Sequence, residues 1–444
     1  MKFQRGANPI STPTGSRRQG ILVAYFAIFL CPALATADER PAEPTGELTL
    51  QKVLSIVLED SPDLAASASD VRAAEARGRY GGLWANPTLL IQLEDALGTK
   101  WLRGFSESQT TFQLGQVFEL GGKVKKRRAV AVGGAKNAKH DYERERATVL
   151  SEAALRFAHL LGDQHRLLLA REATQLSRDA LAAAQKRVAS GAASDVEERR
   201  ARIILARSRI DEEHAEHELL ASRRTLAALW GSTDPKFKAA VGELFVRAPL
   251  PTFADVSGRI AESPELRRLD SEKELRDAEI ALAEARARPN LRLGAGARWL
   301  AGPDAVAFVA NAAVPLPLAN RNQGEIQATR AQREGLAYET EGARVRLIAE
   351  LFAQYQELAH VLVALDALEQ EVLPEAAAAM QTIARGFKLG RRSQLELLDA
   401  QRTLIEVRRE HIDAAEEYHG FVVRMERLIG GPLAGTPKEQ EQMQ

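Results

Sequence analysis

The chain has 444 residues, with 60 basic and 60 acidic side chains, one cysteine and only 5% aromatic residues. This even charge balance argues against the strongly basic surface that nucleic-acid binding needs, and a single cysteine excludes an internal disulfide framework. Alanine, glutamate, arginine and leucine are abundant, which is typical of long helices and coiled coils. We therefore expect a mainly helical protein with no nucleic-acid partner.

Residues 1–37 have the layout of a secretory signal segment. Four basic residues precede the apolar run from Ile21 to Leu30, and Ala35-Thr36-Ala37 forms a cleavage site of small residues. The sequence predicts export and cleavage after Ala37, with an uncleaved anchor as the alternative. Cys31 is a candidate for lipid attachment, but a bulky residue precedes it where a small one is expected.

Beyond residue 37 the chain repeats itself. The stretch that begins "SPDL" at Ser61 returns as "SPEL" at Ser263, and Pro87 returns as Pro289, at a constant offset of 202. A repeat this long indicates an internal duplication and not a solenoid unit. We predict an N-terminal segment at 38–47, repeat one at 48–231, a linker at 232–252, repeat two at 253–430 and a tail at 431–444.

Each repeat is predicted to contain a helix, two strands and a long helical hairpin, in that order. Ser61-Pro62 interrupts the first helix, because the serine can cap a new segment whose first residue is the proline. Alternating apolar and polar side chains predict strands. They are expected at 87–94, 109–120, 290–298 and 304–316. Trp101 and Trp299 are placed in the loops between strands, as membrane-interface anchors or as loop packing.

The longest predicted helix runs from Gly122 to Arg187, which is roughly 100 Å at 1.5 Å per residue. A glycine-containing turn then reverses the chain, and returning helices are expected at 195–230 and 394–429. The second returning helix carries a heptad seam that favours coiled-coil packing, with an ordinary antiparallel bundle as the alternative. The seam consists of Leu397, Ala400, Leu404, Val407, His411, Ala414, Tyr418, Phe421, Met425 and Leu428, and Leu398, Ile405 and Ile412 form a stripe beside it.

The four predicted strands have the length of outer-membrane strands, which is about ten residues. A sheet that crosses a bilayer must close on itself, and single-chain barrels need about eight strands. If these strands span a membrane, several copies of the chain must therefore share one barrel. After residue 37 no apolar run is long enough for a membrane-spanning helix.

Three motifs give the chain a family resemblance. They are "FELGGK" at 118–123, "PLPLANRNQGEI" at 315–326 and "LGRRSQLELLDAQRTLIEVRREHIDA" at 389–414. With these motifs the chain resembles the TolC-type outer membrane factor family of bacterial efflux pumps, in its heavy-metal (cobalt-zinc-cadmium type) branch. The resemblance covers residues 45–432.

The resemblance implies an outer membrane protein with a large periplasmic part. It implies a homotrimer in which twelve strands, four from each chain, form one shared β-barrel in the lipid, while long α-helical hairpins form a periplasmic tunnel. An inner-membrane, proton-driven (RND-type) transporter and a periplasmic adaptor would complete the pump. The chain would be a passive conduit for heavy-metal cations with no cofactor. Small organic toxins and type I protein secretion are the alternative cargoes.

The resemblance also places adaptor docking and gating at the hairpin turns. Glycine supplies the left-handed conformation that ends a helix and serine caps the next one, so the same residues also suit a plain turn. The turn of repeat one lacks the leucines found in repeat two. The matching positions are Arg187, Gly191, Ser194, Phe387, Gly390, Ser393, Leu395 and Leu398.

The sequence contains no catalytic motif, so an enzyme is not expected. His214 and His217 lie three residues apart on one helix face and are the metal-site candidates, although a solvated tunnel wall is the favoured interpretation. His411 is expected to pack in the apolar seam, and the basic run "KVKKRR" at 123–128 is expected to form a solvated collar. The competing class of function is a soluble periplasmic coiled-coil scaffold.

Overall fold

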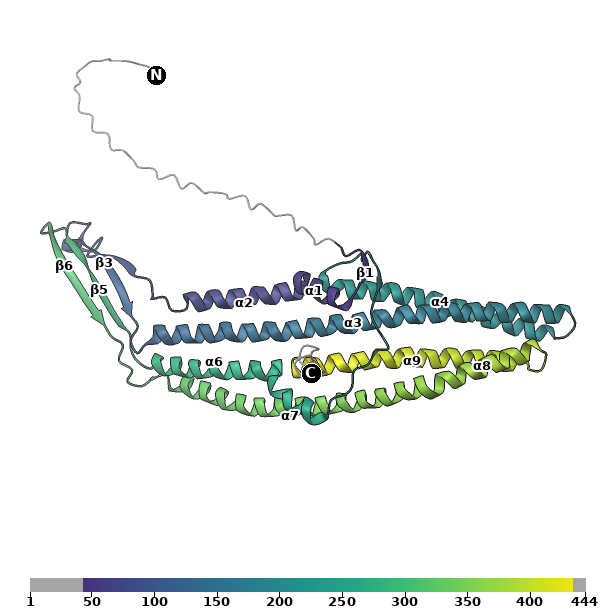
Figure 1. Ribbon diagram of the computed structural model, residues 1–444. Helices are drawn as coiled ribbons and strands as arrows, with labels where there is room; N and C mark the ends of the chain where they lie inside the picture. Colours follow the sequence, from purple (N-terminus) through teal and green to yellow (C-terminus); the bar gives the residue numbers. More distant parts are fainter. Residues whose placement is uncertain (1–42, 434–444) are drawn as a thin grey trace, which may run out of the picture. The chain divides into compact units, whose positions relative to one another are not determined.

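The computed structural model describes residues 43–433. The predicted signal segment, the cleavage site after Ala37, Cys31 and most of the predicted tail lie outside the described residues. The described part is mainly helical with few strands, as predicted (Figure 1). Within it, no helix has an apolar stretch long enough to cross a membrane.

The two halves of the described chain follow the same predicted order, except that the first long helix of the second hairpin is divided into α7 and α8. The first half consists of α1 (Leu50–Asp60), α2 (Pro62–Tyr80), β2 (Thr88–Glu94), β3 (Gln109–Phe118), α3 (Lys123–Ala189) and α4 (Asp195–Ala227). The second half consists of α5 (Phe253–Gly258), α6 (Pro264–Arg286), β5 (Leu291–Leu300), β6 (Ala305–Ala313), α7 (Gln323–Ala367), α8 (Leu373–Lys388) and α9 (Gln394–Ile429). The exact boundaries of the duplication stay a prediction.

Ser61 and Pro62 separate α1 from α2, as predicted. The Ser61 hydroxyl accepts a hydrogen bond from the Leu64 amide at 3.5 Å, and Pro62 is the first residue of α2. Proline suits this position because the first amides of a helix have no partner inside the helix. Ser263 and Pro264 occupy the corresponding start of α6. The repeated Ser-Pro pair therefore starts a helix in both halves.

Strands from both halves form one antiparallel sheet in the order β2-β3-β5-β6. The predicted strands are thus confirmed, but the position of one tryptophan was wrong. Strand β5 extends to Leu300, so Trp299 lies in the strand, where it pairs with Thr110 of β3. Pairing with β3 along its full length extends β5 beyond the alternating stretch that predicted it. Trp101 does lie in the loop between β2 and β3.

One face of this sheet is apolar and exposed. Residues that pair directly across strands share a face. One row on the apolar face, Ile91, Phe112, Ala297 and Phe308, crosses all four strands. Ile91 is 61% exposed, Phe112 52% and Phe308 78%. A contiguous exposed apolar patch marks a contact with a partner or with lipid.

The opposite face of the sheet is polar. Arg298 donates to the Thr111 hydroxyl at 3.0 Å and to Gln109 Oε1 at 3.1 Å. Gln113 Nε2 donates to Asn311 Oδ1 at 2.6 Å. The first two hydrogen bonds connect the neighbouring strands β3 and β5, and the third connects β3 to β6 across Gly294 of β5. The two faces therefore suit two different environments, one apolar and one aqueous.

The long helices lie side by side (Figure 1). Helix α3 packs against α2 and α6 in its first part and against α4 and α9 in its second part. Helix α9 packs in turn against α7 and α8. The helices of the two hairpins are therefore ordered α4, α3, α9 and α7–α8, with α3 and α9 in the middle.

The heptad seam predicted in α9 is a packing seam. Because α9 contacts α3 on one side and α7 and α8 on the other, it needs apolar residues over more than one narrow stripe. Every seam residue is buried or partly buried. Those that are fully buried are Leu397, Leu404, Val407, Tyr418, Met425 and Leu428, together with Leu398 and Ile412 of the second stripe.

The main hydrophobic core lies where the chain passes from its first half to its second. Strands β1 (Gly46–Leu48) and β4 (Phe237–Ala240) pair in parallel there, and Leu48 and Phe237 are buried. The sequence analysis missed both strands, because they are only three and four residues long and too short to show a period. The segment predicted as a linker is therefore part of the core.

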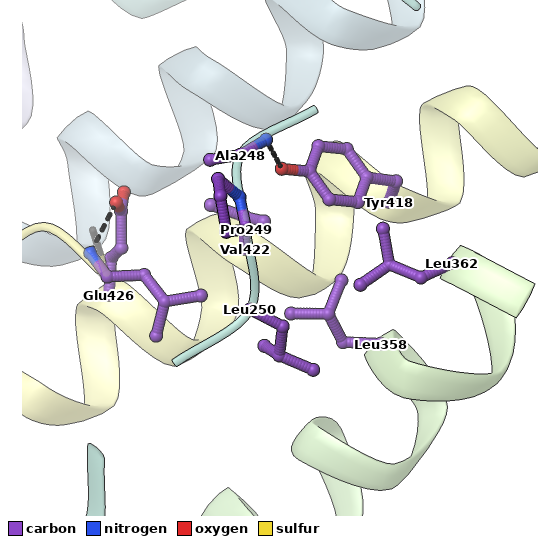
Figure 2. Close-up of a pocket in the computed structure, with 9 residues that line it drawn as sticks. Ala248, Pro249, Leu250, Leu358, Leu362, Tyr418, Val422 and Glu426 are labelled. Atoms are coloured by element: carbon purple, nitrogen blue, oxygen red, sulfur yellow. Dashed lines mark hydrogen bonds between the residues drawn. The ribbon is translucent and has the colours of Figure 1, made fainter. Parts of the chain in front are cut away.

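This linker then crosses α9 and is fixed to it. The Ala248 amide donates to the Tyr418 hydroxyl at 2.8 Å, as Figure 2 shows. Leu250 lies beside Leu358 of α7 and Val422 of α9 in a small apolar pocket (Figure 2). The crossing ties α7 and α9 together at mid-length, so the pocket is a packing site between helices.

The basic run at 123–128 forms the predicted solvated collar only in part: Lys125 and Arg128 are exposed, but Lys123 and Arg127 are not free in solvent. Lys123 is only 7% exposed, and its Nζ donates to the Arg288 carbonyl oxygen at 2.5 Å and to the Asn290 side chain. Arg127 donates to Glu119 at 2.8 Å and to two carbonyl oxygens after α2. Two of the basic side chains therefore fix the start of α3 to the segments that lead into and out of the sheet.

Candidate functional site: the hairpin turns and the seam between them

The two hairpin turns have the same backbone geometry. In each turn the glycine amide donates to the carbonyl three residues back, and the next amide donates to the carbonyl five residues back, at 2.8–3.0 Å. This is the Schellman arrangement that ends helices. Gly191 and Gly390 both have a φ of +71°, and an added Cβ would meet nothing within 4 Å. Glycine is therefore needed because the backbone is left-handed at these positions, and not because a side chain would clash with its surroundings.

Serine caps the returning helix in both turns, but only the second turn has a reciprocal cap. Ser194 accepts from the Val196 amide at 3.3 Å. Ser393 accepts from the Glu396 amide at 3.2 Å, and Glu396 Oε2 accepts from the Ser393 amide at 2.8 Å. This backbone hydrogen bond, with help from Arg392, lowers the pKa of Glu396 to about 2. The second cap is therefore complete above about pH 4.5 and is lost only as the pH falls toward 2.

The ends of α3 and α8 contact each other beside the turns. The Arg187 guanidinium carbon lies 5.0 Å from the centroid of the Phe387 ring, a cation–π distance. Leu395 is 59% exposed, whereas Leu398 is 7% exposed and packs inside the chain. Of the two predicted docking leucines, only Leu395 therefore presents its side chain at the surface of the described chain.

Four polar contacts follow the seam between α3 and α9. Arg408 Nη1 lies 2.6 Å from Glu172 Oε2. Further from the turns, Arg166 donates to Asp413 at 2.8 Å and to Glu416 at 2.6 Å. His159 Nδ1 also lies 2.7 Å from Glu416 Oε1. Each contact joins the first half of the chain to the second, so this seam holds the two hairpins together.

The charges in this seam stabilise one another despite partial burial. Burial opposes the charged form of Arg166, but its hydrogen bonds to Asp413 and Glu416 raise its pKa overall. Burial likewise raises the pKa of Glu416, but the hydrogen bonds from His159 and Arg166 outweigh this and lower it. Sequence analysis missed the cluster because its two parts are about 250 positions apart in the chain.

A second feature that the sequence analysis missed is a π-helical turn at Leu368–Val372, between α7 and α8. Pro374 follows it and was the available signal, since proline has no amide to continue the α-helical hydrogen bonds. Glu369 in this turn lies 2.9 Å from His411 Nε2, and the His411 ring stacks on Phe245 at 4.4 Å. His411 is therefore packed in the seam, as predicted.

The two candidate metal-binding histidines are exposed on α4. His214 Nε2 lies 3.1 Å from Glu218 Oε1 on the same helix, and His217 lies nearly one turn further on. Over residues 43–433, no group of three or more histidine, cysteine, aspartate or glutamate side chains is placed to hold a metal ion. In the described chain, His214 and His217 are thus part of a solvated helix surface.

A comparison with known protein families is consistent with this arrangement of sheet and hairpins. The family described as "Outer membrane efflux protein" matches residues 53–232 and 257–431, which lie in both halves. The chain belongs to this family. This outer membrane efflux protein is therefore an outer membrane protein with a large periplasmic part.

Individual relatives of this outer membrane efflux protein agree with that assignment. The cobalt-zinc-cadmium resistance protein CzcC of Cupriavidus metallidurans is 28% identical over 428 residues, which cover 93% of this chain and 100% of CzcC. The pyoverdine export outer membrane protein OpmQ of Pseudomonas putida is 24% identical and covers 91% of each chain. Crystal structures of CusC superpose with a TM-score of 0.73 at 17% identity, over 86% of this chain and 92% of CusC. The resemblance read from the sequence is confirmed.

Proposed function

We propose that this outer membrane efflux protein is the outer membrane channel of a tripartite, proton-driven pump that exports heavy-metal cations. One observation carries this proposal. A single chain combines a four-stranded sheet with an exposed apolar face and hairpins whose longest helix, α3, has 67 residues. At 1.5 Å per residue that helix reaches roughly 100 Å away from the sheet. The chain is thus built to connect lipid to a distant point in the periplasm.

The sheet supports the proposal that three chains share one barrel. Strands β2 and β6 are the outer strands of the four-stranded sheet, so each has one unpaired edge in the described chain. An unpaired strand edge cannot face lipid, because its backbone groups would have no hydrogen-bond partners. In a trimer, β2 of one chain would pair with β6 of the next, which closes twelve strands. The apolar face would then contact lipid, and the polar face would surround water.

Helix α4 supports the same assembly. Val196, Ile203 and Ile210 recur every seven residues and are 61%, 57% and 64% exposed. They lie roughly 140–200° around the helix from Ala201 and Leu205, which are buried. Helix α4 therefore has a second apolar side that points away from α3, and α4 is the outermost helix of its hairpin.

Helix α7, at the other end of the helix order, has a matching exposed side. Tyr338, Val345 and Val363 are 73%, 59% and 68% exposed. They lie opposite Leu351 and Leu358, which are buried. An α4 edge of one chain can pack against an α7 edge of the next, and such head-to-tail contacts close into a ring.

Replacing Ile210 by glutamate is expected to prevent trimer formation. The substitution would remove about 2 kcal/mol of apolar burial and place a charge in each interface between chains. Native gels and light scattering of the purified protein in detergent would show mainly monomer. Leu168→Glu is the matched control, because Leu168 is 61% exposed but lies on the middle helix α3. Equal amounts of trimer in both variants would contradict this interface.

The hairpin turns are proposed as the gate and as the docking site of the periplasmic adaptor. The exposed Leu395 and the matching glycine turns support a recognition surface there. Leu398 is left out of this surface because it is buried and serves packing. Opening would require the two hairpins to move relative to each other along the α3–α9 seam. The residues proposed for this role are Arg187, Gly191, Ser194, Phe387, Gly390, Ser393 and Leu395.

The similarity to CzcC along the full length of both proteins supports heavy-metal cations as the cargo. The similarity to OpmQ supports a second candidate, the export of small organic molecules. A strain that lacks this protein but keeps the adaptor and the transporter distinguishes the two cargoes. We expect that strain to lose resistance to cobalt, zinc or cadmium, and to recover it with this protein. Restored tolerance to organic toxins without any change in metal resistance would overturn the metal assignment.

A further inference from the structure

His159 lies on the seam between the two middle helices, α3 and α9, and its side chain is 52% exposed. Its Nδ1 lies 2.7 Å from Glu416 Oε1, and its Nε2 lies 3.6 Å from Asp163 Oδ2. The Asp163 side chain is only 3% exposed. Within the described part of the chain, its Oδ2 has no hydrogen-bond partner. A buried carboxylate oxygen without a donor is unfavourable, so this position calls for one more donor.

The imidazole ring can satisfy both carboxylates only when it carries two protons. A neutral ring has one N–H, so donation from Nδ1 to Glu416 leaves a lone pair on Nε2 facing Asp163. The imidazolium ring donates from both nitrogens. We propose that His159 is a proton-operated lock between α3 and α9. When protonated it forms an ion pair with Glu416 of α9 and balances the charge of Asp163 beside it on α3, and when it loses the proton only a neutral hydrogen bond to Glu416 joins the two helices.

The surrounding charges favour a second cation at this point. Asp163, Asp413 and Glu416 all bond to one guanidinium, that of Arg166. Three carboxylates therefore share a single positive charge until His159 is protonated. Arg156, one turn earlier on α3, does not supply the second positive charge, because Arg156 pairs with Glu152 and donates to the Thr225 carbonyl oxygen. The cluster thus lacks a cation that protonated His159 would provide.

A glycine in the middle of α3 makes room for this contact. A Cβ at Gly162 would lie 2.6 Å from Glu416 Oε2 and 3.0 Å from Arg166 Nη1. Glycine weakens a helix interior, and Gly162 is buried where alanine would favour the helix. Its presence allows the Glu416 carboxylate to approach α3 closely enough to reach both Arg166 and His159.

The direction of the pH effect follows from the shift of His159. The hydrogen bond with Glu416 raises the pKa of His159 above 6.5, although burial opposes the shift. A raised pKa means that the contribution to stability is complete below pH 6.5 and is lost as the pH rises through the folded value. The lowered pKa of Glu416 keeps that carboxylate ionised above pH 4.5. The lock is therefore closed in mildly acidic solution and weakens in alkaline solution.

Thermal unfolding of the purified protein tests the lock by comparing the wild type with His159→Gln. At about pH 5.5 we expect the variant to lose about 1–2 °C in Tm, and at about pH 8.5 we expect the two proteins to coincide. Gly162→Ala is a second variant that displaces Glu416 without removing a titratable group. Gly162→Ala should likewise lower Tm at about pH 5.5 and leave Tm nearly unchanged at about pH 8.5.

His360→Gln is the control, because His360 is an exposed histidine on α7. It should leave the pH dependence of Tm unchanged. The inference is overturned if His159→Gln has the same effect at both pH values, or if Gly162→Ala keeps the full pH dependence of the wild type. The test requires no export activity, so a negative result would not affect the proposed function. Equally, a different cargo would not affect the lock.

Discussion

Replacing Ile91 by arginine is expected to abolish insertion of the protein into the outer membrane. Ile91 is in the middle of β2, on the apolar face of the sheet, and is 61% exposed. An arginine on the lipid face of a membrane strand costs about 2–4 kcal/mol at the bilayer centre, and a trimer would contain three of them. On membrane fractionation, the variant should be found as aggregates or degradation products and not in the outer membrane fraction.

Gln92→Arg is the matched control for this experiment. Gln92 is the next residue of the same strand, is exposed and points to the polar face. The same arginine there would contact water, so insertion and trimer formation should be retained. If Ile91→Arg inserts as well as Gln92→Arg does, the apolar face does not contact lipid, and a periplasmic scaffold would explain the chain better.

Replacing Gly390 by valine is expected to abolish metal resistance while the trimer still forms. Gly390 has a φ of +71°, a conformation that costs about 1–2 kcal/mol for most residues and more for a β-branched one. The strain falls on the turn between α8 and α9, roughly 100 Å from the sheet. Insertion should therefore be normal, and the defect should appear in metal resistance and in cross-linking to the adaptor.

Gly390→Asn is the matched control, because asparagine tolerates the left-handed conformation better than other residues with a side chain. An added side chain has space there, since nothing lies within 4 Å of a Cβ at this position. Resistance should be largely retained in this variant. Unchanged resistance in Gly390→Val would remove the turn from the proposed gate.

Much of the fold could be predicted because its signals are local. The returning helix at 394–429 has the predicted ends, since Ser393 caps its start and Gly430 ends it in a left-handed conformation. The four strands of the larger sheet lie at the predicted stretches, two of which show clear alternation of side chains. The errors concern positions that depend on neighbours. Trp299 joins a strand through pairing with β3, and Lys123 is buried by groups from the second half of the chain.

The candidate site was predictable to the same extent. Gly191 and Gly390 were found as turn residues because a left-handed turn needs glycine wherever it occurs. The different exposure of Leu395 and Leu398 depends on which side of α9 faces the neighbouring helices. The hydrogen bond between His159 and Glu416 joins residues 257 positions apart, so no local sequence pattern predicts it.

The sequence by itself determined the long helices of this protein, the four strands of its larger sheet, their order and the family to which it belongs, because helix caps, strand alternation and turn glycines act within a few residues. The tertiary structure alone decided which polar side chains become buried partners. Lys123, Asp163 and Glu416 acquire their roles only when helices distant in the chain pack together. The free energy of a charged group depends on the donors and acceptors that surround it, and packing brings these from both halves of the chain.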